Sequence, residues 1–271
     1  RRKRAERARQ FVKVFGTMPV HTLTSPMLVT YYEGAGKAPW TKKSHAKLLS
    51  SLFQFAVSHK HASVDLLEEL KVANTHLPKI KRGSIRGLVY SPAEMLEILK
   101  CARPGLVPEI VLMAFCRIRR NEIIHREKPA LDCSQIKLDR GHIDLDIEQA
   151  KAEHRRLAPI PDNAKAWLEP YAKKSGRIAL VTDPNKISTM IKFDVNKARK
   201  ANGDETPFHY RKNGFRHSFI SYRVADIQDV AKVALEAGNS VEQIHATYRE
   251  VRTHEEAAEY FAITPKKPGA A

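Results

Sequence analysis

Asn213-Gly-Phe-Arg216-His217-Ser218-Phe219 sets an arginine and a histidine side by side, after a glycine and before the apolar residues of an expected helix. The partial positive charge of a helix N-terminus favours anions. A guanidinium group at such a point can bind two oxygens of a phosphate at once. Taken alone, the segment is equally typical of an ordinary helix start with an arginine that faces solvent. Its meaning therefore depends on the other segments of the chain.

A second arginine segment, Ile118-Arg119-Arg-Asn-Glu122, lies upstream, directly after an apolar run that predicts a helix from Val107 to Phe115. Glu122 is spaced to hold the Arg119 guanidinium in place, and a fixed guanidinium suits the binding of phosphate. The ordinary interpretation of such a pair is an ion pair on the face of a helix.

Two further segments carry groups of related chemistry. Lys151 falls in the turn of an expected β-hairpin formed by residues 142–149 and 157–160, where apolar and polar residues alternate. A lysine there can donate a proton, although surface hairpins often carry lysine. Gly238-Asn239-Ser240 ends one expected helix and caps the next. Tyr248 falls near the end of that next helix, where a tyrosine is usually a packing residue.

In this order and spacing the four segments resemble the motifs of the tyrosine recombinases, also called phage-type integrases, over nearly the whole chain. The resemblance implies that Arg119 and Arg216 bind the nonbridging oxygens of a DNA phosphate and that Lys151 protonates the departing 5′-oxygen. Tyr248 would attack phosphorus to give a 3′-phosphotyrosyl bond, helped to ionise by the positive charge nearby. Glu122 would support Arg119, and His217 is a candidate for shaping the site. The resemblance implies no metal or other cofactor.

Three positions depart from the family pattern. Asn213 stands where the family usually has histidine, and Asn239 stands where it usually has histidine or tryptophan. Asparagine can donate a hydrogen bond to phosphate but does not exchange a proton near neutral pH. Arg117 stands where a glycine usually precedes the first arginine motif. Because Tyr248, both arginines and Lys151 are present, we expect a slow site-specific recombinase or integrase.

Three alternatives stay open at this point. The main one is a catalytically weakened or inactive relative that binds DNA, which the two asparagines favour. A topoisomerase-like enzyme would use the same tyrosine chemistry to relax supercoils without a specific site. A helical scaffold for other proteins would have basic surfaces but would not bind DNA in a salt-dependent way.

Positive charge is concentrated in the first third of the chain. The net charge is +17, and residues 1–90 hold 17 Lys and Arg against 5 Asp and Glu, whereas residues 91–271 hold 30 against 25. Such a bias is typical of a partner that is a polyanion, most often nucleic acid, although some basic surfaces are merely soluble. The residues that we expect to contact DNA are Lys42, Lys43 and Lys47, near the start of an expected helix over 44–60, and Lys79, Lys81 and Arg82.

The pattern of apolar residues predicts a chain of two domains. An all-α domain, which the resemblance identifies as the core-binding domain, is expected over residues 1–80, with Thr41 as the N-cap of the helix over 44–60. A basic linker with glycines follows over 81–90. Residues 91–271 are expected to form the catalytic domain, of mixed α+β class and mainly helical, with a small antiparallel sheet. Capping pairs predict helix starts at Ser91 with Glu94, Ser240 with Gln243, and Thr253 with Glu256.

Composition bounds the partners and the setting. Hydrophobic residues make up 42% of the chain, which suffices for a packed core, and no apolar run is long enough to span a bilayer. Three cysteines without metal-ligand spacing indicate a reducing setting. The sequence opens on Arg1 rather than methionine, as in a trimmed fragment.

The expected partner is double-stranded DNA and not a membrane. The resemblance implies a homotetramer on DNA, a monomer or weak oligomer in solution, and a cytoplasmic, prokaryotic nucleoid-associated location. The expected helix over 255–261 would pack either on a neighbouring protomer or back on its own domain.

Overall fold

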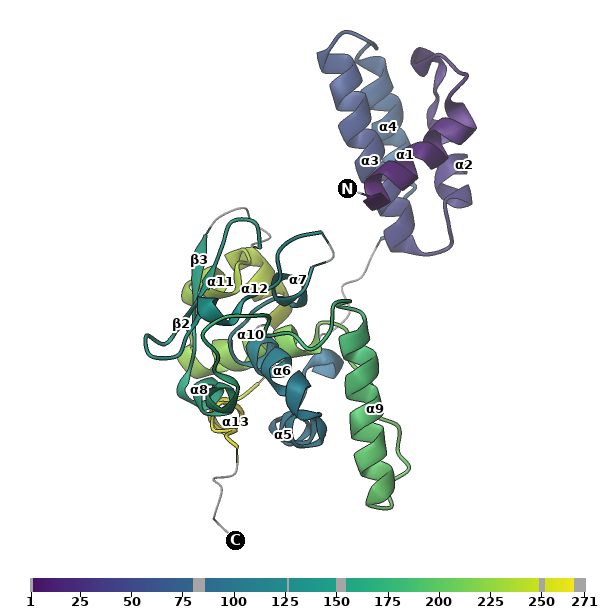
Figure 1. Cartoon of the computed structure of the whole chain (residues 1–271). Coiled ribbons are helices and arrows are strands. Elements are labelled where there is room, and N and C mark those ends of the chain that lie inside the picture. Colours follow the sequence, from purple (N-terminus) through teal and green to yellow (C-terminus); the bar gives the residue numbers. More distant parts are fainter. Residues whose placement is uncertain (1, 80–85, 126, 150–154, 249–251, 266–271) are drawn as a thin grey trace. The chain divides into compact units, whose positions relative to one another are not determined.

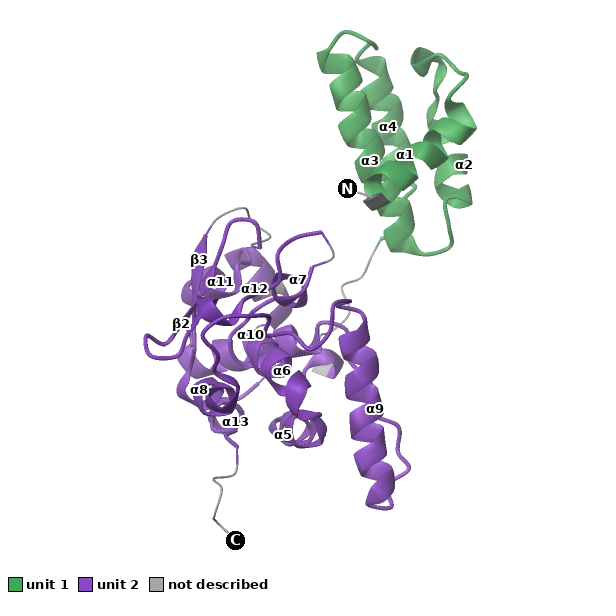
Figure 2. Ribbon diagram, in the orientation of Figure 1, with its two compact units in different colours: residues 1–83 green, residues 84–271 purple. Residues whose placement is uncertain are grey.

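The computed structural model describes residues 2–79, 86–125, 127–149, 155–248 and 252–265 (Figure 1). Contacts divide the chain into two compact units, residues 1–83 and residues 84–271 (Figure 2). Each unit has its own hydrophobic core, as a unit that folds by itself requires. None of the described helices combines the length and the hydropathy that a membrane crossing demands.

Unit 1 is held together by aromatic side chains from three of its helices. Phe11 and Tyr31 meet edge to face with ring centroids 5.5 Å apart, and Phe53 is fully buried beside Phe11. Such contacts add to the stability that burial of the rings provides. The described residues of this unit form α1 (Arg2–Phe15), α2 (Ser25–Gly34), α3 (Pro39–Ser58) and α4 (Asp65–Thr75), with a 3₁₀ turn at Val20–Thr22.

The start of α3 differs from the prediction. The helix begins at Pro39 with Ala38 as its N-cap, so Thr41 lies inside it and the prediction of Thr41 as the cap was wrong. Proline is favoured in the first turn of a helix because its missing N–H would lack a helical partner there. This proline extends the helix upstream of the apolar pattern from which its start was predicted.

Unit 2 is mainly helical. Its described helices are α5 (Pro92–Cys101), α6 (Val107–Ala114), α7 (Arg120–Ile123), α8 (Asp162–Leu168), α9 (Lys186–Ala201), α10 (Gly214–Ile227), α11 (Val230–Ala237), α12 (Val241–Tyr248) and α13 (His254–Phe261), with 3₁₀ turns at Arg86–Leu88, Pro104–Leu106, Cys133–Gln135 and Glu169–Tyr171. The predicted capping pairs are confirmed: the Oγ of Ser91 accepts from the backbone N–H of Glu94, and Ser240 and Thr253 do the same for Gln243 and Glu256.

A small antiparallel sheet of three strands, in the order β1-β2-β3, lies in the same unit. The predicted hairpin is confirmed, because β2 (His142–Leu145) pairs with β3 (Arg156–Pro159), and His142 lies opposite Pro159. The turn of this hairpin, residues 150–154, lies outside the described residues. The sheet also has β1 (Ile136–Lys137), whose two residues are too few to show a pattern in the sequence. The prediction of a helical first unit and a mainly helical second unit with a small sheet is therefore confirmed.

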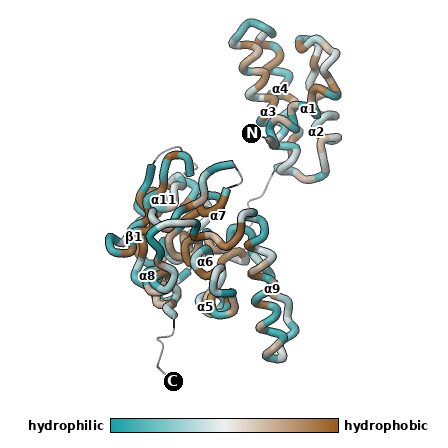
Figure 3. Tube along the Cα trace, in the orientation of Figure 1, coloured by the Kyte–Doolittle hydropathy of each residue, from teal (hydrophilic) through white to brown (hydrophobic). Residues whose placement is uncertain are grey.

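Helices α6 and α10 form the centre of unit 2. Every residue of α6 is buried, and the helix is coloured hydrophobic in Figure 3. Helix α10 packs against α6, α11, α12 and α13. Helix α13 folds back on its own unit, where the fully buried Tyr260 donates a hydrogen bond to the carbonyl oxygen of Ala114 at 3.1 Å. Helix α10 thus connects the core to the segment that carries Tyr248.

Candidate active site

Arg119 is positioned by a sharp turn between α6 and α7. Arg117, at the centre of this turn, has a φ of +54°, in the left-handed region that favours glycine. Its buried guanidinium donates to the carbonyl oxygen of Leu157 on β3 at 3.1 Å, which ties the turn to the sheet. Arginine therefore takes, at this turn, a backbone conformation that glycine adopts more easily. The turn leaves Arg119 as the N-cap residue of α7.

Glu122 joins two arginines beneath this turn. Its carboxylate is 2% exposed and accepts from Arg119 Nη1 at 2.8 Å and from Arg156 Nη2 at 2.7 Å. Burial pushes the pKa of Glu122 upward, but Arg156 and the hydrogen bonds from Arg119 outweigh it and lower the pKa overall. The carboxylate is thus charged at neutral pH and fixes Arg119. Arg156 was not among the predicted site residues, and its position in the returning strand of the hairpin was the available signal.

Arg216 is positioned by the start of α10. A Cβ on Gly214 would lie 2.5 Å from Tyr90 Cε2, so only glycine lets the helix approach Tyr90. Asn213, just before it, has a φ of +58°, a conformation that asparagine tolerates better than most residues. Arg216, in the first turn of the helix, donates from Nη2 to Asn239 Oδ1 at 2.6 Å. Burial and the neighbouring Arg119 lower the pKa of Arg216 to about 10, so it stays charged at neutral pH.

The two arginines meet at the turn between α11 and α12. Nη2 of Arg119 donates to the carbonyl oxygens of Ala237 at 3.3 Å and Gly238 at 3.1 Å. Nη2 of Arg216 donates to the same oxygen of Ala237. Gly238 has a φ of +60°, and a Cβ there would lie 3.1 Å from Arg119 Nη2. The predicted pair of clamps is therefore brought together from segments almost one hundred residues apart in the sequence.

Tyr248 is the last residue of α12 and is 3% exposed. Its hydroxyl oxygen lies 2.8 Å from Nδ1 of His217. Burial raises the pKa of Tyr248, and the positive charge of Arg216, which acts in the opposite direction, does not outweigh it. The expected help from nearby positive charge is present, because Arg216 lowers the pKa of Tyr248, but burial outweighs it. Burial and Arg216 both lower the pKa of His217, so its ring favours the neutral form.

A basic cleft of about 520 Å³ opens beside the arginines. Asn213 and the aromatic ring of Tyr210 line it, whereas Tyr248 does not belong to its lining in the described part of the chain. The lining also brings together basic side chains that were not predicted for the site, and their closeness to the two arginine motifs in the sequence was the available signal. These are Arg120, His125, Lys128 and Lys212.

Three of the predicted site residues cannot be placed. Lys151, Lys81 and Arg82 lie outside the described residues. Lys42 is half-buried near the start of α3. The other predicted lysines of unit 1 gather at one groove.

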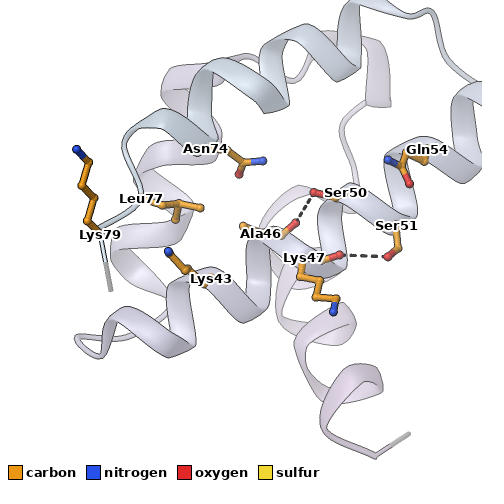
Figure 4. Close-up of a pocket in the computed structure, with 9 residues that line it drawn as sticks. All are labelled: Lys43, Ala46, Lys47, Ser50, Ser51, Gln54, Asn74, Leu77 and Lys79. Atoms are coloured by element: carbon orange, nitrogen blue, oxygen red, sulfur yellow. Dashed lines mark hydrogen bonds between the residues drawn. The ribbon is translucent and has the colours of Figure 1, made fainter. Parts of the chain in front are cut away.

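This groove, of about 560 Å³, lies between α3 and the end of α4 in unit 1 (Figure 4). Lys43, Lys47 and Lys79 line it, and none of its lining residues is acidic. Uncharged hydrogen-bonding groups accompany the lysines: Asn74, whose Oδ1 accepts from the hydroxyl of Tyr32 at 3.0 Å, as well as Ser50, Ser51 and Gln54. The groove therefore combines positive charge with donors and acceptors, as a surface for a polyanion would.

Comparisons with known proteins give a fold and no close relative. No family model matches the chain, and no curated protein matches it. Among solved structures, a lambda integrase fragment in a dimer bound to a COC′ core site is similar over 92% of this chain and 88% of that chain, at 18% identity and a TM-score of 0.63. A lambda integrase fragment bound to DNA has the same coverage, at 17% identity and a TM-score of 0.59. At such low identity the likeness shows the fold alone.

Proposed function

We propose that this chain, which has the fold of lambda integrase, is a tyrosine-type recombinase that cuts and rejoins double-stranded DNA through a 3′-phosphotyrosyl intermediate. One observation carries the proposal: Arg119 and Arg216 donate to the same carbonyl oxygen, and Tyr248 bonds to His217 within the electrostatic reach of Arg216. Two cations next to a nucleophile are what phosphoryl transfer needs.

The chemistry follows from these groups. A phosphate of the DNA would replace the carbonyl oxygens as the acceptor of the two guanidinium groups, which then stabilise the charge that develops on the nonbridging oxygens. The hydroxyl oxygen of Tyr248 attacks phosphorus, and the bond to the 5′-oxygen breaks. Lys151, by resemblance, gives the departing oxygen its proton. Rejoining reverses these steps, so the energy of the broken bond is kept in the phosphotyrosyl link.

DNA binding is proposed for both units. In unit 1, residues 1–80 would bind the DNA backbone through the groove lined by Lys43, Lys47 and Lys79, with Lys42, Lys81 and Arg82 as further contacts. In unit 2, within residues 91–271, the cleft beside Arg119 would take the phosphate that is cut. We propose that the chain acts on DNA as a homotetramer and works at the nucleoid of a prokaryotic cell.

A second candidate function is DNA binding without cleavage. Tyr248 is buried and hydrogen-bonded, and Asn213 and Asn239 do not exchange protons. A protein with these features would bind the same DNA but would not form the covalent link.

A covalent-trapping experiment separates the two functions. Nicked DNA from the chain's own genomic neighbourhood is incubated with the protein and with Tyr248→Phe, then run on a denaturing gel. A slower band that protease removes and that is absent with Tyr248→Phe supports the recombinase. Salt-dependent binding to the same DNA without such a band supports the binding protein. Relaxation of supercoiled DNA that lacks any bound site would instead indicate topoisomerase-like activity.

A further inference from the structure

We infer that His217 is the catalytic proton acceptor for the Tyr248 hydroxyl during strand cleavage. The inference rests on the proposed function and assigns a role that the two asparagines at the site do not fill. The direct contact between Nδ1 of His217 and the hydroxyl oxygen of Tyr248, at 2.8 Å, is its starting point. This distance is within the range at which a proton passes between a base and a hydroxyl group.

His217 is half-buried and is held in place by its helix. It lies in the first turn of α10, directly after Arg216, and the helix on either side of it is anchored to Tyr90. Gly214 lies against the ring of Tyr90, and Ser218 Oγ accepts from the backbone N–H of Tyr90 at 2.8 Å. The same helix turn therefore presents both a phosphate clamp and a base, in a fixed relation to each other.

The tyrosine needs such a base. Burial keeps its pKa above the ordinary value, so the hydroxyl is protonated at neutral pH and must lose its proton as it attacks. Arg119 and Arg216 are charged and have no lone pair to accept a proton. The side chains of Asn213 and Asn239 do not exchange a proton at neutral pH. The ring of His217 is neutral there, and its Nδ1 accepts when the ring proton is on Nε2.

The same proton moves in opposite directions during cleavage and rejoining. As the oxygen of Tyr248 bonds to phosphorus, its proton passes to Nδ1 of His217 and the bond to the 5′-oxygen breaks. The 5′-oxygen leaves as a hydroxyl with a proton from a cationic acid, the ammonium group of Lys151 by resemblance. The imidazolium that forms lies near the cation Arg216, which disfavours it. The negative charge of the phosphate offsets this cost, so the base works only when DNA is bound. In rejoining, the imidazolium returns the proton to Tyr248.

The test uses the full chain and the DNA on which wild-type protein forms the covalent link. The single-turnover rate of link formation is measured for wild type, His217→Ala and His217→Gln. Loss of a general base lowers a rate by about 100-fold or more, so both variants are expected to slow by this factor while they still bind DNA. Glutamine keeps polarity and similar size, which guards against failure of the alanine variant to fold. His245→Ala, an exposed histidine of α12, is the matched control and is expected to keep the wild-type rate.

Two further readouts distinguish a base from a residue that only orients the tyrosine. Added imidazole is expected to restore part of the rate of His217→Ala and none of the rate of His217→Gln. A DNA with sulfur in place of the 5′-bridging oxygen has a leaving group that needs no proton. This DNA is expected to restore the rate of link formation in Lys151→Ala but not in His217→Ala.

The outcomes separate this inference from the proposed function. If His217→Ala and His217→Gln form the link close to the wild-type rate, the inference is wrong and the recombinase proposal stands. If the sulfur-substituted DNA rescues His217→Ala, His217 acts on the leaving group and the inference is again wrong. If wild-type protein forms no link on any DNA that it binds, both proposals fail together.

Discussion

Nδ1 of the half-buried His217, the residue after Arg216, lies 2.8 Å from the hydroxyl oxygen of the buried Tyr248. This contact determines the first prediction, because each partner has a pKa displaced by burial. The pKa of His217 is lowered and that of Tyr248 is raised, so the pair favours a neutral ring and a protonated hydroxyl over a wide range of pH.

The rate of link formation is expected to be level near pH 8 and to fall at lower pH, as the ring of His217, with an ordinary pKa of about 6.5, takes up a proton. Within the described residues, burial and then the positive charge of Arg216 push the protonation of His217 to lower pH. Single-turnover rates across this range check the prediction. The rate of His217→Gln should not decrease at low pH in this way. A wild-type rate that does not fall at low pH would contradict it. The free energy of unfolding should also decrease below about pH 6.5. There His217 of the unfolded chain binds a proton, whereas the lowered pKa of folded His217 disfavours it.

Removal of the negative charge of Glu122 is expected to lower the stability of unit 2 strongly. Replacing it with glutamine removes the carboxylate that pairs with Arg119 and Arg156 while keeping its size. Because the carboxylate is buried and the arginines are partly exposed, we expect the free energy of unfolding at pH 7 to fall by roughly 2 to 4 kcal/mol. The pKa of Glu122 is lowered on folding, so its contribution is present above about pH 4 and lost as the pH falls further.

Urea unfolding of unit 2 in the full chain measures this effect. Glu259→Gln, an exposed glutamate of α13, is the control and should leave the free energy of unfolding nearly unchanged. Equal effects of the two substitutions would show that the buried ion pairs contribute nothing to stability.

The contact between Asn239 and Arg216 leads us to expect that one substitution changes stability and activity in opposite directions. Asn239→Asp keeps the oxygen that accepts from Arg216 and gives it a negative charge. A carboxylate there holds Arg216 more tightly and competes with phosphate for it. We expect a higher melting temperature and a slower covalent link, by about tenfold for roughly 1.4 kcal/mol of stronger pairing. Asn185→Asp, at an exposed position, changes the net charge equally and should leave the rate unchanged. A faster rate in Asn239→Asp would mean that Arg216 does not bind the phosphate.

The groove of unit 1 predicts how DNA binding responds to salt. Each phosphate contact contributes about 0.9 to the slope of log affinity against log salt on duplex DNA. Replacing Lys43, Lys47 and Lys79 together with alanine should therefore reduce this slope by about 2 to 3. Fluorescence anisotropy over a series of salt concentrations measures the slope. Lys71→Ala, which removes an exposed lysine of α4, is the control and should leave the slope nearly unchanged. An unchanged slope in the triple variant would show that DNA does not bind in this groove.

Local features of the structure could be predicted from the sequence, because a few neighbouring residues determine them. The capping pair of Ser91 and Glu94 and the spacing of Arg119 and Glu122 are three residues apart, and both form the contacts that this spacing permits. The order of helices and the hairpin followed from periodicity in the same way. The arrangement of the two arginine segments was given by the resemblance rather than by any local signal.

Features that depend on distant contacts could not be predicted. Glu122 of α7 pairs with Arg156 of β3, and neither segment alone indicates the other. The burial of Tyr248 results from the packing of α12 on α10, so the direction of its pKa shift, and hence the need for a base, was invisible in the sequence. Lys151 was predicted from the hairpin and the resemblance, and its role stays a prediction.

Two backbone oxygens occupy the guanidinium groups: that of Ala237 accepts from Arg119 and Arg216, and that of Gly238 accepts from Arg119. They are attached to the chain and are always present at high effective concentration, whereas inorganic phosphate, nucleotides and other small anions of a cell must compete with them from solution. A small anion has few other contacts with which to win this competition. A DNA duplex, the proposed ligand, would have further contacts with the basic side chains of the cleft. Under the proposed function, the backbone of this turn would exclude small metabolites, and the arginines would be released only to a ligand that the rest of the protein has already bound.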